Sequence, residues 1–212
     1  SESTFSTSII MTRRPSASWV CSTRPPGRER ASSTTTSVPP SIRSRAALRP
    51  ARPAPSTAAV DVDETEWRQV FATLVDPLPR LARAVLPQMI ARRAGKILVM
   101  GSASALRGMK RASTYSAARG AQLAYVQAVG VEVAPFNVQV NAIAQNFVAN
   151  PTYFPPEVQA NPRFQERLKR EVPLGRLVAA REDAEFAAFL CSAAADCFVG
   201  QVFPVCGGWV GR

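Results

Sequence analysis

Two neighbouring stretches, KILVMGS at residues 96–102 and STYSAAR at residues 113–119, decide the fold of this chain. The first is a continuous apolar run that ends in Ser102, a pattern typical of a buried strand in a parallel sheet. The second opens a helix on which Tyr115 and Arg119 stand one turn apart on the same face. A strand, a loop and a helix in this order indicate an α/β fold.

The polar residues of the two stretches also suggest a reaction. A tyrosine normally loses its proton near pH ~10, and a neighbouring positive charge favours the phenolate. Arg119 supplies that charge and cannot itself give up a proton. We therefore expect Tyr115 to deprotonate a hydroxyl group while Ser102 donates a hydrogen bond to the same oxygen. Two rival serines, Ser104 and Ser113, have poorer spacing, and without Ser102 the other two residues would be an ordinary surface pair on a helix.

These stretches resemble the short-chain dehydrogenase/reductase superfamily, whose usual pattern is a serine, a tyrosine, and a lysine four residues after the tyrosine. Here the last position is Arg119. The version with arginine resembles the halohydrin dehalogenases, which use the same scaffold without a nicotinamide cofactor. The resemblance covers roughly residues 57–212 and extends over NAIAQNF at 141–147, NPTYFP at 150–155, VPLGRL at 172–177, GQ at 200–201 and GGW at 207–209.

The resemblance implies a Rossmann-like, doubly wound parallel sheet and an enzyme that closes vicinal haloalcohols to epoxides with release of halide and no cofactor. Ser102 would hold the substrate hydroxyl, Tyr115 as the phenolate would remove its proton, and Arg119 would favour the phenolate and pass the proton to water. In reverse, azide, cyanide or nitrite would open an epoxide with Tyr115 as the acid. The resemblance also implies a homotetramer.

A loop after the next strand matches the position at which the family holds its halide. Backbone N–H groups, backed by apolar and aromatic side chains, can bind a halide without a formal cation. The residues to which the resemblance assigns halide or substrate binding are Gln145, Asn146, Phe147, Val148, Tyr153, Phe154 and Trp209. The same loop would contact substrate in any short-chain reductase, and Trp209 can equally pack at the C-terminal end.

Two other functions stay open. The first is an NAD(P)-dependent oxidoreductase in which arginine has replaced lysine, although arginine is not an equivalent donor for the nicotinamide ribose that this lysine contacts. The second is a catalytically inactive fragment or a binding protein with a basic tail.

Hydrophobic periodicity and turn residues predict the remaining elements. A long helix over about 64–93 should start at Asp63 and be kinked or broken by Pro77, Pro79 and Pro87. The other predicted helices cover about 114–134 and 182–191, and a further helix follows Pro156, is interrupted near Pro162 and resumes over 164–170. The predicted strands cover 96–101, 138–143 and 201–205. Only the second half of a doubly wound sheet is legible, which leaves one sheet edge unpaired unless residues 1–56 or a partner covers it.

Composition excludes several classes of function. The chain of 212 residues has no histidine, which excludes Ser-His-Asp triads and histidine metal sites. Its four cysteines, Cys21, Cys191, Cys197 and Cys206, form no metal-binding pattern and fit thiols in a reducing cytoplasm. No stretch is long and apolar enough to span a bilayer. We therefore expect a cytoplasmic protein with no metal, membrane or nucleic-acid partner.

Residues 1–56 differ from the rest and form the first of two expected regions, with the enzyme domain at 57–212. They hold nine arginines against Glu2 and Glu29, so most of the net charge of +11 lies there. Their bias toward Arg, Ser, Thr and Pro predicts disorder and no visible strand. A transit peptide and a basic nucleic-acid-binding arm are possible interpretations, but the composition is best explained by a GC-rich coding region read in the wrong frame.

Overall fold

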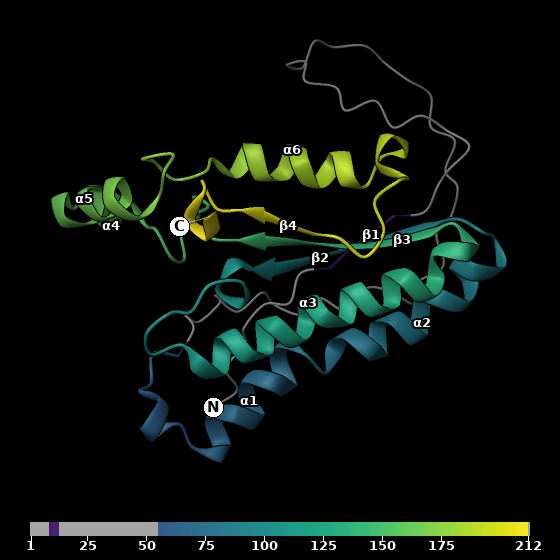
Figure 1. The fold of residues 1–212 in the computed structure, drawn as a ribbon, viewed down its shortest axis with the longest axis horizontal. Coiled ribbons are helices and arrows are strands. Elements are labelled where there is room, and N and C mark those ends of the chain that lie inside the picture. Colours follow the sequence, from purple (N-terminus) through teal and green to yellow (C-terminus); the bar gives the residue numbers. More distant parts are fainter. Residues whose placement is uncertain (1–8, 13–54, 212) are drawn as a thin grey trace, which may run out of the picture. The chain divides into compact units, whose positions relative to one another are not determined.

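The computed structural model describes residues 9–12 and 55–211, and of residues 9–12 only the backbone. All of these described residues belong to one compact unit. Its centre is a four-stranded sheet in the order β1-β2-β3-β4, with bounds Ile9–Thr12, Gly95–Ser102, Val138–Gln145 and Val202–Val205 (Figure 1). Strands β2, β3 and β4 are parallel, which confirms the predicted α/β fold with a parallel sheet.

The register of the sheet brings the ends of two strands together. In the ladder between β2 and β3, Gly95 pairs with Val138 and Ser102 pairs with Gln145. Because carboxyl ends of parallel strands meet at one edge of a sheet, the loops that follow Ser102 and Gln145 start side by side. Ligands of open α/β sheets bind at this edge.

Helices cover both faces of the sheet. Figure 1 shows α1 (Glu64–Leu74), α2 (Pro77–Ala91) and α3 (Ser113–Val133) on one face and α6 (Ala180–Leu190) on the other. The remaining helices are the short α4 (Pro156–Gln159), α5 (Pro162–Glu171), and the 3-10 turns Ala59–Asp61, Ala103–Ala105, Ala134–Phe136, Ala193–Ala195 and Trp209–Gly211.

Alternate side chains of the strands fill two cores. Ile97 and Val99 of β2 point toward α2 and α3, whereas Leu98 packs with Ile143 and with Leu190 of α6. This alternation follows from the period of two in a strand. The apolar runs are continuous because both faces of the sheet are buried.

The long helix predicted over 64–93 is instead two helices. Asp63 caps the first as expected, since its side chain accepts a hydrogen bond from the N–H of Glu66 at 2.7 Å. The break comes at Pro77, which has no N–H to donate and therefore starts α2 rather than continuing α1. Pro87 lies inside α2. The helix expected after Pro156 is interrupted near Pro162 as predicted, since α4 ends at Gln159 and α5 begins at Pro162.

Strand β1 corrects the expectation that residues 1–56 contain no strand. Its backbone pairs antiparallel with β2, from Ile9 opposite Val99 to Thr12 opposite Lys96. The outer edge of β2 is therefore covered by the chain's own N-terminal region, one of the two possibilities that the sequence left open. Apart from residues 55 and 56, the rest of the expected disordered segment lies outside the described residues.

Helix α3 crosses the sheet very closely at Gly130. A Cβ atom at this position would lie 2.6 Å from the Cα of Gly200 and 2.9 Å from the carbonyl oxygen of Val140. Gly200 itself has a φ of +63° in the left-handed region. Glycine at 130 thus fixes the distance between α3 and the sheet, and with it the placement of the first turns of α3 at the carboxyl edge.

No helix in the described ranges is long and apolar enough to span a membrane. Within the same ranges, no group of three or more His, Cys, Asp or Glu side chains is arranged to hold a metal ion. Cys191, Cys197 and Cys206 are free thiols, and Cys21 lies outside the described residues.

Candidate active site

One cavity of about 650 Å³ opens at the carboxyl edge of β2 and β3. Ser102, at the end of β2, and Tyr115 and Arg119, on the first turns of α3, all line it. Most of the predicted halide or substrate residues line the same cavity, namely Gln145, Asn146, Phe147, Val148, Tyr153 and Phe154. The structure thus brings together residues that the sequence places in four separate elements.

Ser102 is buried and already engaged with a neighbour. Its Oγ lies 2.9 Å from the Oγ of Ser104 and accepts a hydrogen bond from the Ser104 N–H at 3.2 Å. Since the hydroxyl accepts from the backbone, its own hydrogen is free to point to Ser104 or to a bound oxygen. Ser104, which the sequence ranked as a rival, is therefore a partner of Ser102.

Arg119 lies against Tyr115, as the spacing of one helical turn predicts. Its guanidinium carbon is 5.1 Å from the centroid of the Tyr115 ring. Arg119 is 8% exposed, and no carboxylate in the described part of the chain pairs with its guanidinium. A buried charge without a counter-ion acts strongly on its surroundings, because little water screens it.

Arg119 is held in place by a residue that the sequence did not reveal. Its Nη1 donates to the carbonyl oxygen of Met100 at 3.1 Å and to Oε1 of Gln122 at 2.9 Å. Gln122 is fully buried, and its Nε2 donates to the carbonyl oxygen of Leu74 at 2.5 Å. The signal for Gln122 is a polar residue three positions after Arg119, on a helix face otherwise filled by Leu123 and other apolar residues.

The loop after β3 offers two hydrogen-bond donors for an anion. The N–H of Asn146 donates to Val205, and the N–H of Phe147 donates to Oδ1 of Asn146 at 2.9 Å, so both N–H groups are used by the protein. The side-chain NH₂ of Asn146 is turned away from that bond, and the N–H of Val148 has no partner among the described residues. Phe147 adopts a φ of +52°, which turns the chain sharply at this point.

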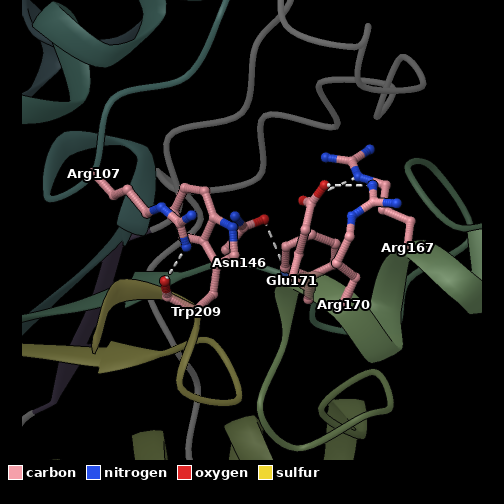
Figure 2. A network of polar contacts seen from close by, with 7 residues as sticks. Arg107, Asn146, Arg167, Arg170, Glu171 and Trp209 are labelled. Carbon is pink, nitrogen blue, oxygen red and sulfur yellow. Dashed lines mark hydrogen bonds and ion pairs between the residues drawn. The ribbon is translucent and has the colours of Figure 1, made fainter. Parts of the chain in front are cut away.

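Aromatic rings close the wall behind this loop. The buried ring of Phe147 stacks with Phe154 at 6.0 Å between centroids and meets the edge of Trp209 at 6.1 Å. Arg107 covers Trp209, with its guanidinium carbon 4.7 Å from the ring and its Nη1 donating to the Trp209 carbonyl (Figure 2). Trp209 is therefore buried behind the wall and is not among the residues that line the cavity, which agrees with the alternative that it packs at the C-terminal end.

Tyr153 stands across the cavity from the catalytic candidates and is half-exposed. Partial burial raises the pKa of Tyr153; Tyr115 raises this pKa further, and Arg119 lowers it. These influences show that the three side chains share one electrostatic environment, although only Tyr115 has the guanidinium against its ring.

A carboxyl group is also present, and sequence reasoning missed it. Asp183, in the first turn of α6, is 8% exposed and accepts a hydrogen bond from Nε2 of Gln145. Its Oδ1 has no hydrogen-bond partner in the described chain. Burial raises the pKa of Asp183, and the hydrogen bond from Gln145 opposes that shift. No local signal marks this contact, because Gln145 and Asp183 meet only through the packing of α6 on the sheet.

Comparison with known proteins adds to this description. A family model described as enoyl-(acyl carrier protein) reductase matches residues 45–210. The uncharacterized oxidoreductase YmfI of Bacillus subtilis is 34% identical over 149 residues, which cover 70% of this chain and 60% of that protein. The 3-oxoacyl-[acyl-carrier-protein] reductase FabG of Pseudomonas aeruginosa is 35% identical over 150 residues, which cover 70% of this chain and 59% of that one.

A solved structure is similar to this chain at a comparable sequence identity. Halohydrin dehalogenase HheC, bound to ethyl (2S)-oxiran-2-ylacetate, superposes with a TM-score of 0.70 and 32% identity, over 74% of this chain and 64% of that chain. The chain therefore spans about three fifths of the length of the curated relatives that it matches. Since one family model matches most of its residues and the fold agrees, the chain belongs to the enoyl-(acyl carrier protein) reductase family of the short-chain dehydrogenase/reductase superfamily.

Proposed function

We propose that the protein is a cofactor-independent halohydrin dehalogenase, which converts vicinal haloalcohols to epoxides and catalyses the reverse opening of epoxides by small anions. The observation that carries the proposal is the buried guanidinium of Arg119 against the ring of Tyr115, at the position where reductases of this superfamily carry lysine. The similarity to halohydrin dehalogenase HheC supports it.

The reaction needs a base, a hydrogen-bond donor and an exit for halide. Tyr115, with the guanidinium of Arg119 against its ring, takes the proton of the substrate hydroxyl, and Ser102 donates a hydrogen bond to the same oxygen. The resulting alkoxide attacks the neighbouring carbon, so that a C–O bond forms as the carbon–halogen bond breaks and the halogen leaves with the electron pair. The reverse reaction protonates the opening oxygen from Tyr115.

We assign the departing halide to the loop after β3. The side-chain NH₂ of Asn146 and the N–H of Val148 are the available donors, and Phe147 and Phe154 supply the apolar wall. Gln145 and Tyr153 complete the site, since both line the same cavity. A weakly hydrated anion suits such a site because its donors are polar without being charged.

An NAD(P)-dependent oxidoreductase is the second candidate, and the names of the sequence relatives favour it. Nη1 of Arg119 is bonded inward to Met100 and Gln122, whereas the superfamily's lysine faces the nicotinamide ribose. The glycine-rich turn expected for this cofactor falls outside the described residues, so we derive no hydride-transfer step.

Halide release from a vicinal chloro- or bromoalcohol without nucleotide tests the proposal. We expect the parent protein to release halide and Tyr115→Phe to lose at least ~100-fold in rate, because the general base is gone. Tyr125→Phe is the matched control, since Tyr125 lies on the same helix but does not line the cavity. Turnover of a carbonyl compound that requires NAD(P)H, with no halide release, would reject the dehalogenase.

We also propose that the protein assembles as a homotetramer, which the family resemblance supports. Light scattering coupled to size-exclusion chromatography measures the mass directly. A monomeric mass at the concentration of the activity assay would reject the tetramer.

A further inference from the structure

The mouth of the cavity carries a set of cations that the proposed reaction does not use. We call Lys110, Arg111 and Arg167 the basic rim, and all three line the cavity and are exposed. Lys110 and Arg111 form a turn in the loop between β2 and α3, whereas Arg167 comes from α5. Two elements that are distant in sequence therefore place positive charge at one opening.

The turn that carries Lys110 and Arg111 is defined by its backbone. Arg111 has a φ of +59°, in the left-handed region that side chains rarely adopt. Its Nε donates to the carbonyl oxygen of Ser56 at 3.2 Å. No acidic side chain within residues 55–211 forms an ion pair with Lys110 or Arg111. Their charges are therefore uncompensated by the described part of the protein.

Arg167 faces the same space from the other side. Its guanidinium carbon lies 5.7 Å from the ring of Phe147, and its Nε donates to Glu171 at 3.1 Å. Figure 2 shows the carboxylate of Glu171 paired with both Arg167 and Arg170. Because an arginine has five N–H donors and only Nε is used in this bond, the outer nitrogens of Arg167 can still bind an anion.

The charges are sorted along the cavity. Arg119 lies at the inner end, the basic rim lies at the mouth, and Asp183 is the only carboxyl residue of the lining. Asp183 is buried and hydrogen-bonded to Gln145, so it does not neutralise the mouth. A volume of about 650 Å³ falls within the range of sites for ligands much larger than a three-carbon alcohol. A substrate placed at Ser102 and Tyr115 has room for a substituent that reaches the rim.

We propose that the basic rim binds a carboxylate on the substrate, so that the preferred substrates are haloalcohols and epoxides that carry an anionic group. This inference rests on the proposed function. The carbinol carbon lies at Ser102 and Tyr115, the leaving halide lies at the loop after β3, and the remaining substituent extends its carboxylate to Lys110, Arg111 and Arg167. A concentration of like charges at a cavity mouth also speeds the arrival of an anionic substrate.

A matched pair of substrates tests this directly. 4-Chloro-3-hydroxybutanoate and its carboxamide have nearly the same shape and differ in charge. We expect kcat/KM for halide release to favour the carboxylate about tenfold at low salt, because two or three partly exposed charges act on it. The preference should shrink toward unity in sodium sulfate at an ionic strength of about 1 M, where charges are screened within a few ångströms and no halide is added to the assay. Equal rates, or a preference for the carboxamide, overturn the inference.

Substitutions in the basic rim test whether these residues cause the preference for the carboxylate. Lys110→Gln and Arg167→Gln should each lower the preference for the carboxylate about threefold, mostly through KM, and Arg167→Lys should restore most of it. Lys169→Gln is the matched control, because Lys169 is exposed on α5 but does not line the cavity. An equal loss in Lys169→Gln, or equal losses for both substrates in the rim variants, overturns the inference.

The two hypotheses fail in different ways. Release of halide from the carboxamide with no preference for the carboxylate rejects the rim site and leaves the dehalogenase in place. No release from either substrate rejects the proposed function and the rim site together.

Discussion

Gln122 determines where the charge of Arg119 lies. It is fully buried, and its side chain connects the guanidinium to the carbonyl oxygen of Leu74 at the end of α1. A buried side chain that satisfies two partners is costly to truncate, because both partners lose a hydrogen bond that water cannot replace. Once Gln122 is truncated, only the carbonyl oxygen of Met100 accepts a hydrogen bond from Nη1 of Arg119.

We predict that Gln122→Ala lowers the rate of halide release about tenfold near neutral pH, because the guanidinium of Arg119 loses one of its two acceptors and is no longer fixed against the ring of Tyr115. Gln127→Ala, at an exposed position of the same helix, is the control. An unchanged rate together with a lower melting temperature would show that Gln122 supports only the fold.

The burial of Asp183 predicts how the stability of the fold depends on pH. Burial raises its pKa, so the folded protein holds this proton to higher pH than the unfolded chain does. The free energy of unfolding therefore falls as pH rises from the ordinary carboxyl range through the raised pKa. Asp183→Asn removes the titrating group and keeps an oxygen that can accept from Gln145. We expect its melting temperature to exceed that of the parent at neutral pH and the two to converge in acid.

The control for Asp183 is Glu185→Gln on the same helix, at an exposed position. Its melting curve should keep the pH dependence of the parent protein. A melting temperature of Asp183→Asn that is lower at every pH would contradict the prediction, because it would mean that the carboxylate stabilises the fold.

At the scale of elements, the contact of α3 with the sheet at Gly130 controls the whole site. We predict that Gly130→Ala lowers the free energy of unfolding by roughly 1 to 3 kcal/mol, since the new Cβ meets backbone atoms of Gly200 and Val140 that cannot rotate away. Gly120→Ala is the control on the same helix, where a Cβ meets nothing within 4 Å. It should be neutral or stabilising by up to ~1 kcal/mol, because alanine favours helix. Urea denaturation of the two variants distinguishes these outcomes.

The sequence pattern was sufficient to predict the helices and strands in which apolar residues recur with a clear period. Four elements lie within one or two residues of their predicted bounds, because each buries a continuous row of apolar side chains. These are the strands at 95–102 and 138–145 and the helices at 113–133 and 180–190. The break at Pro77 could be anticipated but not located, since a proline can kink a helix or begin one. The four residues IIMT at 9–12 are too few to show a period.

The candidate site could be predicted only in part, for a related reason. Ser102, Tyr115 and Arg119 belong to one strand-loop-helix unit, whose local geometry keeps them close. Gln122 and Asp183 gain their roles from Leu74 and Gln145, which are distant in sequence and reach them only after the helices pack on the sheet. Trp209 sits behind Phe147 for the same reason, as the C-terminal turn packs under Arg107.

For the molecule as a whole, β1 covers the edge of β2 from Lys96 to Val99, so this stretch of β2 is not open to pairing with another chain. We predict that Ile10→Pro weakens this pairing, because proline fixes φ at about −65°, away from the extended strand, and cannot donate a backbone hydrogen bond, with a loss of roughly 1 kcal/mol. The variant should also associate more at high concentration. Ile10→Val keeps the N–H and serves as the control. Unchanged melting and light scattering in Ile10→Pro would show that this pairing does not contribute to stability in solution.

The pairing of Thr12 with Lys96 also bears on the order in which the protein folds. The strands β2, β3 and β4 and their connecting helices meet through contacts that follow one another along the chain, whereas β1 must find β2 across a long intervening sequence. Closing such a distance costs chain entropy before any contact forms. The strand nearest the N-terminus should thus be the last to dock, and changes in it should speed unfolding while leaving the folding rate nearly unaltered.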